Sequence, residues 1–235
     1  MALDVAPPTS PLIRPRVRVL GDVLIDGTRG ERPPLARRVR EIVTYLALSP
    51  GGSEAAFNEA IFPGQVSGEK VRKNRNEYMR LARKWVGRDE EGHPFVCLVP
   101  DGGYALSGVS VDWTIFQQLV ADDVTSAPTD DLREALALVR GRPLSGLEEQ
   151  RWEWAMTLKT VMSEAVVEVS REVVARSLEA ADFGTAATAA EIGVMVAPWD
   201  QRLWDAAETV AHATGGRGAR DELRRRAGRA MEGLD

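Results

Sequence analysis

The chain has 235 residues, of which 44% are hydrophobic and 28% charged, and its formal net charge is −5. This composition is ordinary for a globular protein, and the single cysteine, Cys97, excludes an internal disulfide framework. No apolar run is long enough to span a bilayer and the N-terminus does not resemble a signal peptide, so we expect a cytoplasmic protein with no membrane contact by this segment.

Charge is unevenly distributed along the chain. Residues 1–120 contain 16 basic and 14 acidic side chains, whereas residues 121–235 contain 14 and 21. The positive charge of the first half is concentrated in one predicted helix. The second half is acidic and is not expected to bind nucleic acid by itself.

The N-terminal end predicts a linker followed by strands. The Pro-rich stretch "DVAPPTSPLIRPR" (residues 4–16) is typical of an extended linker, which we assign to residues 1–15. A free N-terminus has little need of a stiff spacer, so we also consider that the chain is a fragment of a larger protein. "VRVLGDVLIDG" (residues 17–27) then alternates apolar and polar residues around a glycine and predicts a strand pair.

Three helices and a hairpin follow in the first half. Apolar residues recur at helical spacing up to "SPGG", and Ser53 is placed to cap a short second helix, "EAAFNEAIF". The third helix lies within "GEKVRKNRNEYMRLARKWVG" (residues 68–87). After it, "PFVCLVPDGGYALSG" has two short apolar runs around a Gly-rich turn and predicts a β-hairpin.

The third helix is expected to have one buried and one basic face. On a helical wheel the apolar arc contains Val71, Tyr78, Leu81, Ala82 and Trp85. The opposite arc contains Arg72, Lys73, Asn76, Arg80, Arg83 and Lys84. We interpret this arc as a stripe without acids, which costs stability through like-charge repulsion and therefore indicates an anionic partner. Arg and Lys neutralise phosphates, and Arg or Asn can read base edges, although a merely solvated face remains the alternative.

The order of elements predicts the first domain. A small sheet, a helix, a short helix, a basic amphipathic helix and a hairpin together make a winged helix-turn-helix, with the third helix placed to enter the major groove. The sheet ahead of the first helix is typical of the response-regulator output subtype. We assign this domain to residues 16–110.

The second half predicts only helices. Segments separated by Gly, Pro or Asp, with short connections and small residues such as Ala186 and Ala190 at expected crossings, favour tetratricopeptide-like stacking over residues 111–235, with a generic helical bundle as the alternative. We expect Trp152, Trp154, Trp199 and Trp204 to lie in its core. The predicted fold class is thus mainly α with small β: a winged helix-turn-helix followed by an all-α, tetratricopeptide-like domain.

The chain resembles the bacterial transcriptional activator domain family, the antibiotic-pathway regulators of actinobacteria. The matching segments, in order, are "VRVLGDVLIDG", "YLALSPGG", "NEAIFPG", "RNEYMRLARKWVG", "PDGGYALSG", "VDWTIFQQLV", "LREALALVRGRPLSGL" and "WDQRLWDAAETVAHATGGRGA". They cover nearly all of residues 16–230. The resemblance implies duplex DNA with direct repeats as ligand, and RNA polymerase or another protein as the partner of the helical domain; a homo-oligomer is a further expectation.

The resemblance also implies roles for the third-helix residues. Arg72, Asn76 and Arg80 would face bases, and Lys73, Arg83 and Lys84 would grip phosphates. Arg75 borders the core and is a weaker candidate, while Arg37 and Arg38 on the first helix either touch the DNA backbone or are solvated. One residue departs from the family pattern: Asp101 stands in the wing, where members usually carry a basic or neutral residue, and an acid there would repel phosphate.

Other chemistry finds little support in the sequence. There is no Ser-His-Asp setting, nucleophile elbow or phosphate loop, so we predict that the chain is not an enzyme and needs no cofactor. His93 and His212 lack a second His or Cys at ligand spacing, so no metal site is expected. The sequence therefore predicts a DNA-binding transcriptional regulator. The alternative is a protein-interaction module that does not bind DNA and forms the cytoplasmic part of a larger actinobacterial protein.

Overall fold

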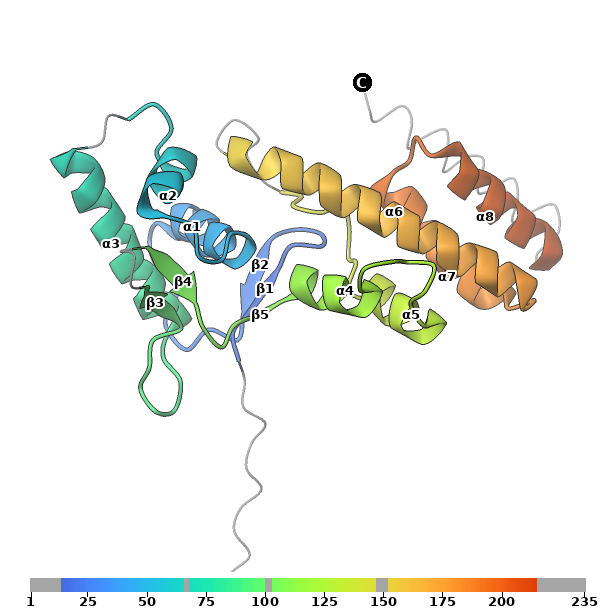
Figure 1. Cartoon of the computed structure of the whole chain (residues 1–235), viewed down its shortest axis with the longest axis horizontal. Coiled ribbons are helices and arrows are strands. Elements are labelled where there is room, and N and C mark those ends of the chain that lie inside the picture. Colours follow the sequence, from blue (N-terminus) through green and yellow to red (C-terminus); the bar gives the residue numbers. More distant parts are fainter. Residues whose placement is uncertain (1–13, 66–67, 100–102, 147–151, 215–235) are drawn as a thin grey trace, which may run out of the picture. The chain divides into compact units, whose positions relative to one another are not determined.

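The computed structural model describes residues 14–65, 68–99, 103–146 and 152–214 (Figure 1). Contacts within the chain divide it into two compact units. The first unit consists of Met1–Val17 and Ile25–Ser110, and the second of Arg18–Leu24 and Val111–Asp235. The segment Arg18–Leu24 thus belongs with the helical half of the chain, although it lies close to the N-terminus in sequence.

Three short strands form the first sheet. Strands β1 (Arg16–Arg18), β2 (Leu24–Asp26) and β5 (Ser110–Val111) are ordered β2-β1-β5. The predicted strand pair is confirmed, and β5 adds a strand that the sequence did not predict. Arg16 Nε lies 2.9 Å from Asp26 Oδ1, so an exposed ion pair accompanies the β1–β2 pairing.

The helices of the first unit follow the predicted order. They are α1 (Ala36–Leu48), α2 (Glu54–Ile61) and α3 (Glu69–Val86). Ser53 caps α2 as predicted, because its Oγ accepts a hydrogen bond of 3.2 Å from the Ala56 N–H. Phe57 of α2 is buried and makes an edge-on contact with Tyr45 of α1 at 5.5 Å between ring centroids, which joins α1 and α2 in one apolar core.

The hairpin of the first unit is antiparallel. Strands β3 (Val96–Leu98) and β4 (Tyr104–Leu106) pair with Val96 opposite Leu106 and Leu98 opposite Tyr104. The predicted hairpin is therefore confirmed as a pair of strands. Asp101, on which the expected weakness of the wing depends, lies outside the described residues.

The second unit begins with two short helices and holds the segment Arg18–Leu24. Helix α4 (Asp112–Val120) starts with a buried aspartate, and α5 (Thr129–Ala137) follows. The Asp112 carboxylate accepts hydrogen bonds from the backbone N–H groups of Val19, at 2.8 and 3.0 Å, and Leu20, at 3.1 Å. This carboxylate fixes the early segment to the start of α4.

Three longer helices complete the second unit. A 3₁₀ turn (Glu153–Ala155) leads into α6 (Met156–Glu179), followed by α7 (Phe183–Val196) and α8 (Gln201–Thr214), and Figure 1 shows α6, α7 and α8 side by side. Short connections separate them, as expected for stacked helix pairs. Gly193 lies where α7 meets its neighbours, because a Cβ placed there would stand 2.6 Å from Leu203 and 2.9 Å from Ser170.

The tryptophans of the second unit are placed differently from one another. Trp152 is buried and stacks on half-buried Trp154, with ring centroids 5.5 Å apart. Trp204 is half-buried and donates its indole N–H to the Pro198 carbonyl at 2.7 Å. The prediction that all four lie in the core is wrong for Trp199, which is 59% exposed in the α7–α8 connection.

The predicted fold class is confirmed. The described chain is mainly helical with short strands, and it joins a winged helix-turn-helix to an all-α unit of stacked helices. Among the described residues, no helix combines the length and apolar character needed to cross a membrane.

Candidate nucleic-acid interface

Helix α3 begins and ends where its sequence dictates. Gly68 stands at its N-cap without a side-chain cap, and Glu69 in the first turn complements the positive end of the helix dipole. Arg83 and Lys84 complement the negative end. Gly87 then ends the helix with φ of +94°, a conformation that glycine adopts without steric cost.

One face of α3 is anchored in the first unit. Its buried residues are Val71, Arg75, Met79, Leu81, Ala82, Trp85 and Val86. They include four residues of the predicted apolar arc and add Met79, which is fully buried. Tyr78, the fifth predicted residue, is half-buried and stacks on Phe62 at 6.3 Å between ring centroids. Because these contacts fix the rotation of the helix, the opposite face is held toward solvent.

The six candidate residues lie on that opposite face, but their surroundings differ. Five of them are exposed: Arg72, Lys73, Asn76, Arg80 and Lys84. Arg83 is half-buried. Arg72, Asn76 and Lys84 have no side-chain hydrogen bond or ion pair to another described residue, so these three groups are available to an external ligand.

Two cations of the face are paired with acids of α3 itself. Lys73 Nζ lies 2.9 Å from Glu69 Oε1, and Arg80 donates to Glu77 through both Nε, at 2.8 Å, and an Nη, at 2.7 Å. The hydrogen bond from Arg80 lowers the pKa of the Glu77 carboxyl, and the same contact raises the pKa of Arg80. The interpretation of the stripe as free of acids is therefore wrong, since Glu69 and Glu77 reach it at i,i+4 and i,i+3 spacing.

Arg83 connects α3 to the hairpin. Its Nε donates to the Val96 carbonyl at 3.1 Å, and its guanidinium lies over the Tyr104 ring at 5.5 Å from the centroid. Both partners belong to the wing strands, which sequence periodicity on α3 could not reveal. In this position Arg83 holds β3 and β4 beside α3, and part of its donor capacity is already used.

Arg75 is buried in the helix-turn-helix and contacts α2. Its side chain is 8% exposed, and its guanidinium forms an ion pair with Glu54 at the start of α2. Its Nε has no hydrogen-bond partner among the described residues. A pocket of about 360 Å³ opens here between α2 and α3, lined by Glu54, Asn58, Gly68, Glu69, Val71, Arg72 and Arg75. Arg75 thus contributes to the angle between the two helices, in line with its prediction as a weak DNA contact.

Arg38 is also engaged within the first unit. Its guanidinium bonds to the buried Glu41 carboxylate and to the Ile61 carbonyl at the end of α2, and it lies 5.2 Å from the Phe62 ring centroid. With 14% of its side chain exposed, Arg38 is held within its unit, so the interpretation of a solvated surface residue is wrong. A contact of Arg38 with the DNA backbone stays a prediction. Arg37 is exposed.

The second unit has a pocket of its own. It measures about 550 Å³ and lies between α5, α6 and α7. Leu136, Val173 and Ile192 give it an apolar lining, and Asp130 and Arg133 give it charge. The pocket is a concave surface within the helical unit, as expected where helices stack.

Comparison with known proteins bears on the fold. No family model matches the chain, and no curated protein matches it in sequence. Among solved structures, Mycobacterium tuberculosis EmbR, in complex with a low-affinity phosphopeptide, is similar at a TM-score of 0.62 and 18% identity. The match covers 91% of this chain and 59% of the EmbR chain, so this chain spans about three fifths of that protein. The likeness shows the fold and agrees with the family resemblance at that level.

Proposed function

We propose that the chain is a DNA-binding transcriptional regulator whose α3 enters the major groove of duplex DNA. The observation that carries this proposal is the face of α3 on which Arg72, Asn76 and Lys84 are exposed without partners among the described residues. This face belongs to a winged helix-turn-helix whose hairpin adjoins the same helix. An α-helix fits the major groove, and such a face supplies both base-reading and phosphate-binding groups.

In this proposal the N-terminal half of the α3 face contacts the bases. Arg72 and Asn76 are one helical turn apart, so they lie on one line along α3. A guanidinium can bind guanine and an amide can bind adenine in bidentate geometry. We assign base contact to Arg72 and Asn76, and to Arg80 once it is released from Glu77.

Phosphate binding falls to the remaining cations. Lys73, Arg83 and Lys84 neutralise backbone charge in the proposal, with Arg83 adding to its contacts with the wing. Lys73 and Arg80 exchange their acidic partners for the ligand on binding. Because exposed ion pairs of this kind contribute little to stability, breaking them on DNA binding costs little free energy.

The helical unit provides protein contact in the proposal. Its pocket of about 550 Å³ combines apolar and charged groups, which suits a peptide segment of a partner. The EmbR structure is a complex with a low-affinity phosphopeptide, in a chain longer than this one. From the family resemblance we propose RNA polymerase or another protein as partner, direct repeats as the DNA target, and homo-oligomers on those repeats. Such a regulator is not an enzyme and acts in the cytoplasm, where bacterial DNA lies.

A second candidate function is an interaction module that does not bind DNA. The observation that favours it is the internal pairing of the α3 face: Lys73, Arg80 and Arg83 already have partners in their own unit. A module of this kind would use the helical unit alone to contact a partner protein.

The two candidates separate in a binding experiment with matched variants. Wild type, Arg72→Ala/Asn76→Ala/Lys84→Ala and Arg133→Ala/Arg202→Ala are titrated against a fluorescent mixed-sequence duplex at about 50 mM salt, where phosphate contacts are strong. The control removes the same net charge from exposed positions of α5 and α8. The regulator proposal expects at least a tenfold weaker binding of the α3 variant and little change in the control. Absence of wild-type binding leaves the interaction module as the function.

A further inference from the structure

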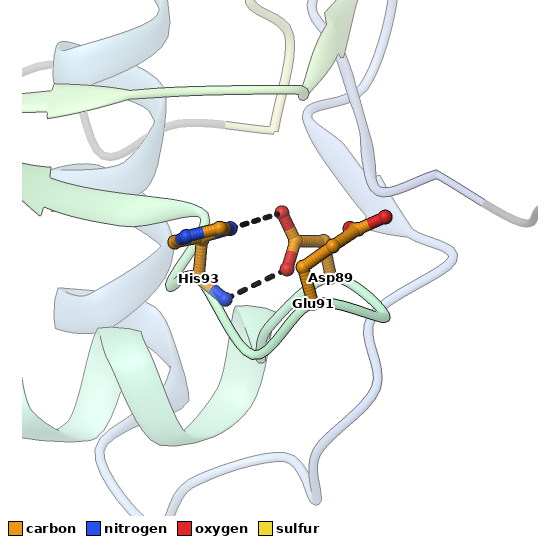
Figure 2. A group of neighbouring side chains, drawn as sticks. All are labelled: Asp89, Glu91 and His93. Carbon is orange, nitrogen blue, oxygen red and sulfur yellow. Dashed lines mark hydrogen bonds and ion pairs between the residues drawn. The ribbon is translucent and has the colours of Figure 1, made fainter.

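A cluster of metal-ligating groups lies outside the α3 face, in the segment that joins α3 to the wing. Figure 2 shows Asp89, Glu91 and His93 on one short loop, with their side chains gathered on the same side. Each offers one ligand atom, and these three atoms all lie within 4.8 Å of one another. Sequence reasoning missed the group because it looked only for His or Cys partners of His93; the signal was the alternating Asp-x-Glu-x-His spacing.

The loop backbone holds the cluster in place. The Asp89 N–H donates to the His93 carbonyl at 2.9 Å, and the His93 N–H donates to Asp89 Oδ1 at 2.7 Å. Arg88 pairs with Pro94 in an antiparallel bridge and donates from its guanidinium to the Gly92 carbonyl at 2.6 Å. Gly92 makes the turn with φ of +85°. The loop, and with it Asp89 and His93, is therefore held by contacts that do not need a metal.

The spacing of His93 and Asp89 suits a bound cation better than a direct hydrogen bond. His93 Nδ1 lies 3.4 Å from Asp89 Oδ2, beyond the usual range for an N–H···O bond. Two ligands at zinc–nitrogen and zinc–oxygen bond lengths around a tetrahedral ion stand roughly 3.4 Å apart. Glu91 is exposed and has no ion pair to another described residue, so its carboxylate is available as a third ligand.

We propose that Asp89, Glu91 and His93 form a binding site for a borderline divalent cation, with Zn²⁺ as the ion that best suits the donors. One imidazole with two carboxylates favours zinc over magnesium or calcium, which prefer oxygen donors alone. Water completes the coordination, because the loop is open to solvent. The bound ion links three residues of the loop that connects α3 to β3. This site does not depend on DNA binding.

Zinc titration of the full chain tests the site. Protein freed of metal with a chelator is titrated with zinc chloride by calorimetry, for wild type and for Glu91→Gln, His93→Gln and Glu90→Gln. Glu91→Gln leaves the hydrogen bonds that close the loop in place, so a folding defect cannot mimic loss of a ligand. Glu90→Gln is the matched control, since Glu90 lies in the same loop but its carboxylate faces Arg29 at 3.9 Å.

The expected result is one zinc ion per chain, at least tenfold weaker binding in Glu91→Gln and in His93→Gln, and less than a twofold change in Glu90→Gln. Three results would overturn the proposal: no zinc binding by wild type, zinc binding that both ligand variants retain, or magnesium binding as tight as zinc.

Discussion

Arg176 on α6 and Arg72 on α3 are both arginines on the side of a long helix, yet their surroundings have little in common. Arg176 donates to five acceptors: Glu172, Thr129, and the carbonyls of Val124, Thr125 and Ala127. Arg72 is exposed and has no side-chain partner among the described residues. Arg176 ties elements of the helical unit together, whereas Arg72 is left for a ligand.

The same contrast extends to neighbouring charges. Arg140 lies 3.7 Å from the buried Asp112 carboxylate, and Arg171 pairs with Asp200 in the α7–α8 connection. On the exposed face of α3 the pairs of Lys73 and Arg80 are exposed and local. A charged side chain that pairs with a residue distant in sequence should contribute to stability. A charged side chain without a described partner should contribute to binding instead. Substitutions in both regions test this division.

The largest effect is expected where the helical unit has no free space. Gly193→Val should lower the free energy of unfolding by about 3 kcal/mol, because the new side chain overlaps Leu203 and Ser170. Urea unfolding measures the change. Gly184→Ala is the control: a Cβ there meets only Asp182 Oδ1 at 3.7 Å, so stability should hold or rise. Equal effects of both substitutions would contradict close packing at α7.

The arginine that joins α6 to the α4–α5 connection comes next. Arg176→Ala should cost about 2–3 kcal/mol, since its removal leaves several carbonyls without a donor. Arg133→Ala, which breaks only an exposed pair with Asp130, should cost less than about 1 kcal/mol. Urea unfolding of both variants measures the change. If Arg176→Ala left the free energy of unfolding unchanged, Arg176 would not be a structural contact of the helical unit.

The buried carboxylate of Asp112 should show a dependence on pH. Burial raises its pKa above the ordinary 3.8, against hydrogen bonds from Val19 and Leu20 and the charge of Arg140. Between these two pKa values the folded state binds more protons than the unfolded state, so the contribution of Asp112 to stability falls as pH rises through this window. Asp112→Asn should cost about 1–2 kcal/mol at neutral pH and lose this dependence.

Unfolding free energies of wild type and Asp112→Asn, compared from pH 4 upward, provide the measurement. The gap between the two proteins should shrink as pH rises. A gap that grows instead would show that the carboxylate is favoured in its charged form and that the stated cause of the shift is wrong.

The smallest stability effect is expected on α3. Arg72→Ala, Asn76→Ala and Lys84→Ala should each change the free energy of unfolding by less than about 0.5 kcal/mol, because these side chains have no partner in the described part of the chain. Thermal or urea unfolding measures the change for each variant. A loss of 1 kcal/mol or more from any of them would place that residue among the structural contacts.

The sequence predicted the features that depend on local patterns. The buried and exposed faces of α3, the Ser53 cap and the two strands of the wing follow from helical spacing, capping chemistry and turn residues. Each needs only neighbours within a few positions along the chain.

The features that the sequence did not predict arise from contacts distant in sequence or from side-chain reach. Arg18–Leu24 joins the helical unit because Asp112, about ninety positions away, accepts its N–H groups. Arg83 contacts the wing, and Arg38 contacts the end of α2, through partners that are likewise distant in sequence. The helical wheel of α3 missed two acids: it began at Val71, after Glu69, and Glu77 lies at the edge of the basic arc. Trp199 lies in a connection, where helical spacing gives no information.

The salt dependence of DNA binding tests the central claim most directly. If α3 neutralises phosphates, the logarithm of wild-type affinity should fall linearly with the logarithm of salt concentration, and Lys73→Ala or Lys84→Ala should each reduce that slope by about 0.9. Arg202→Ala, on α8, should leave the slope unchanged. A wild-type affinity that does not respond to salt, or a slope that the α3 variants share with wild type, would contradict the account.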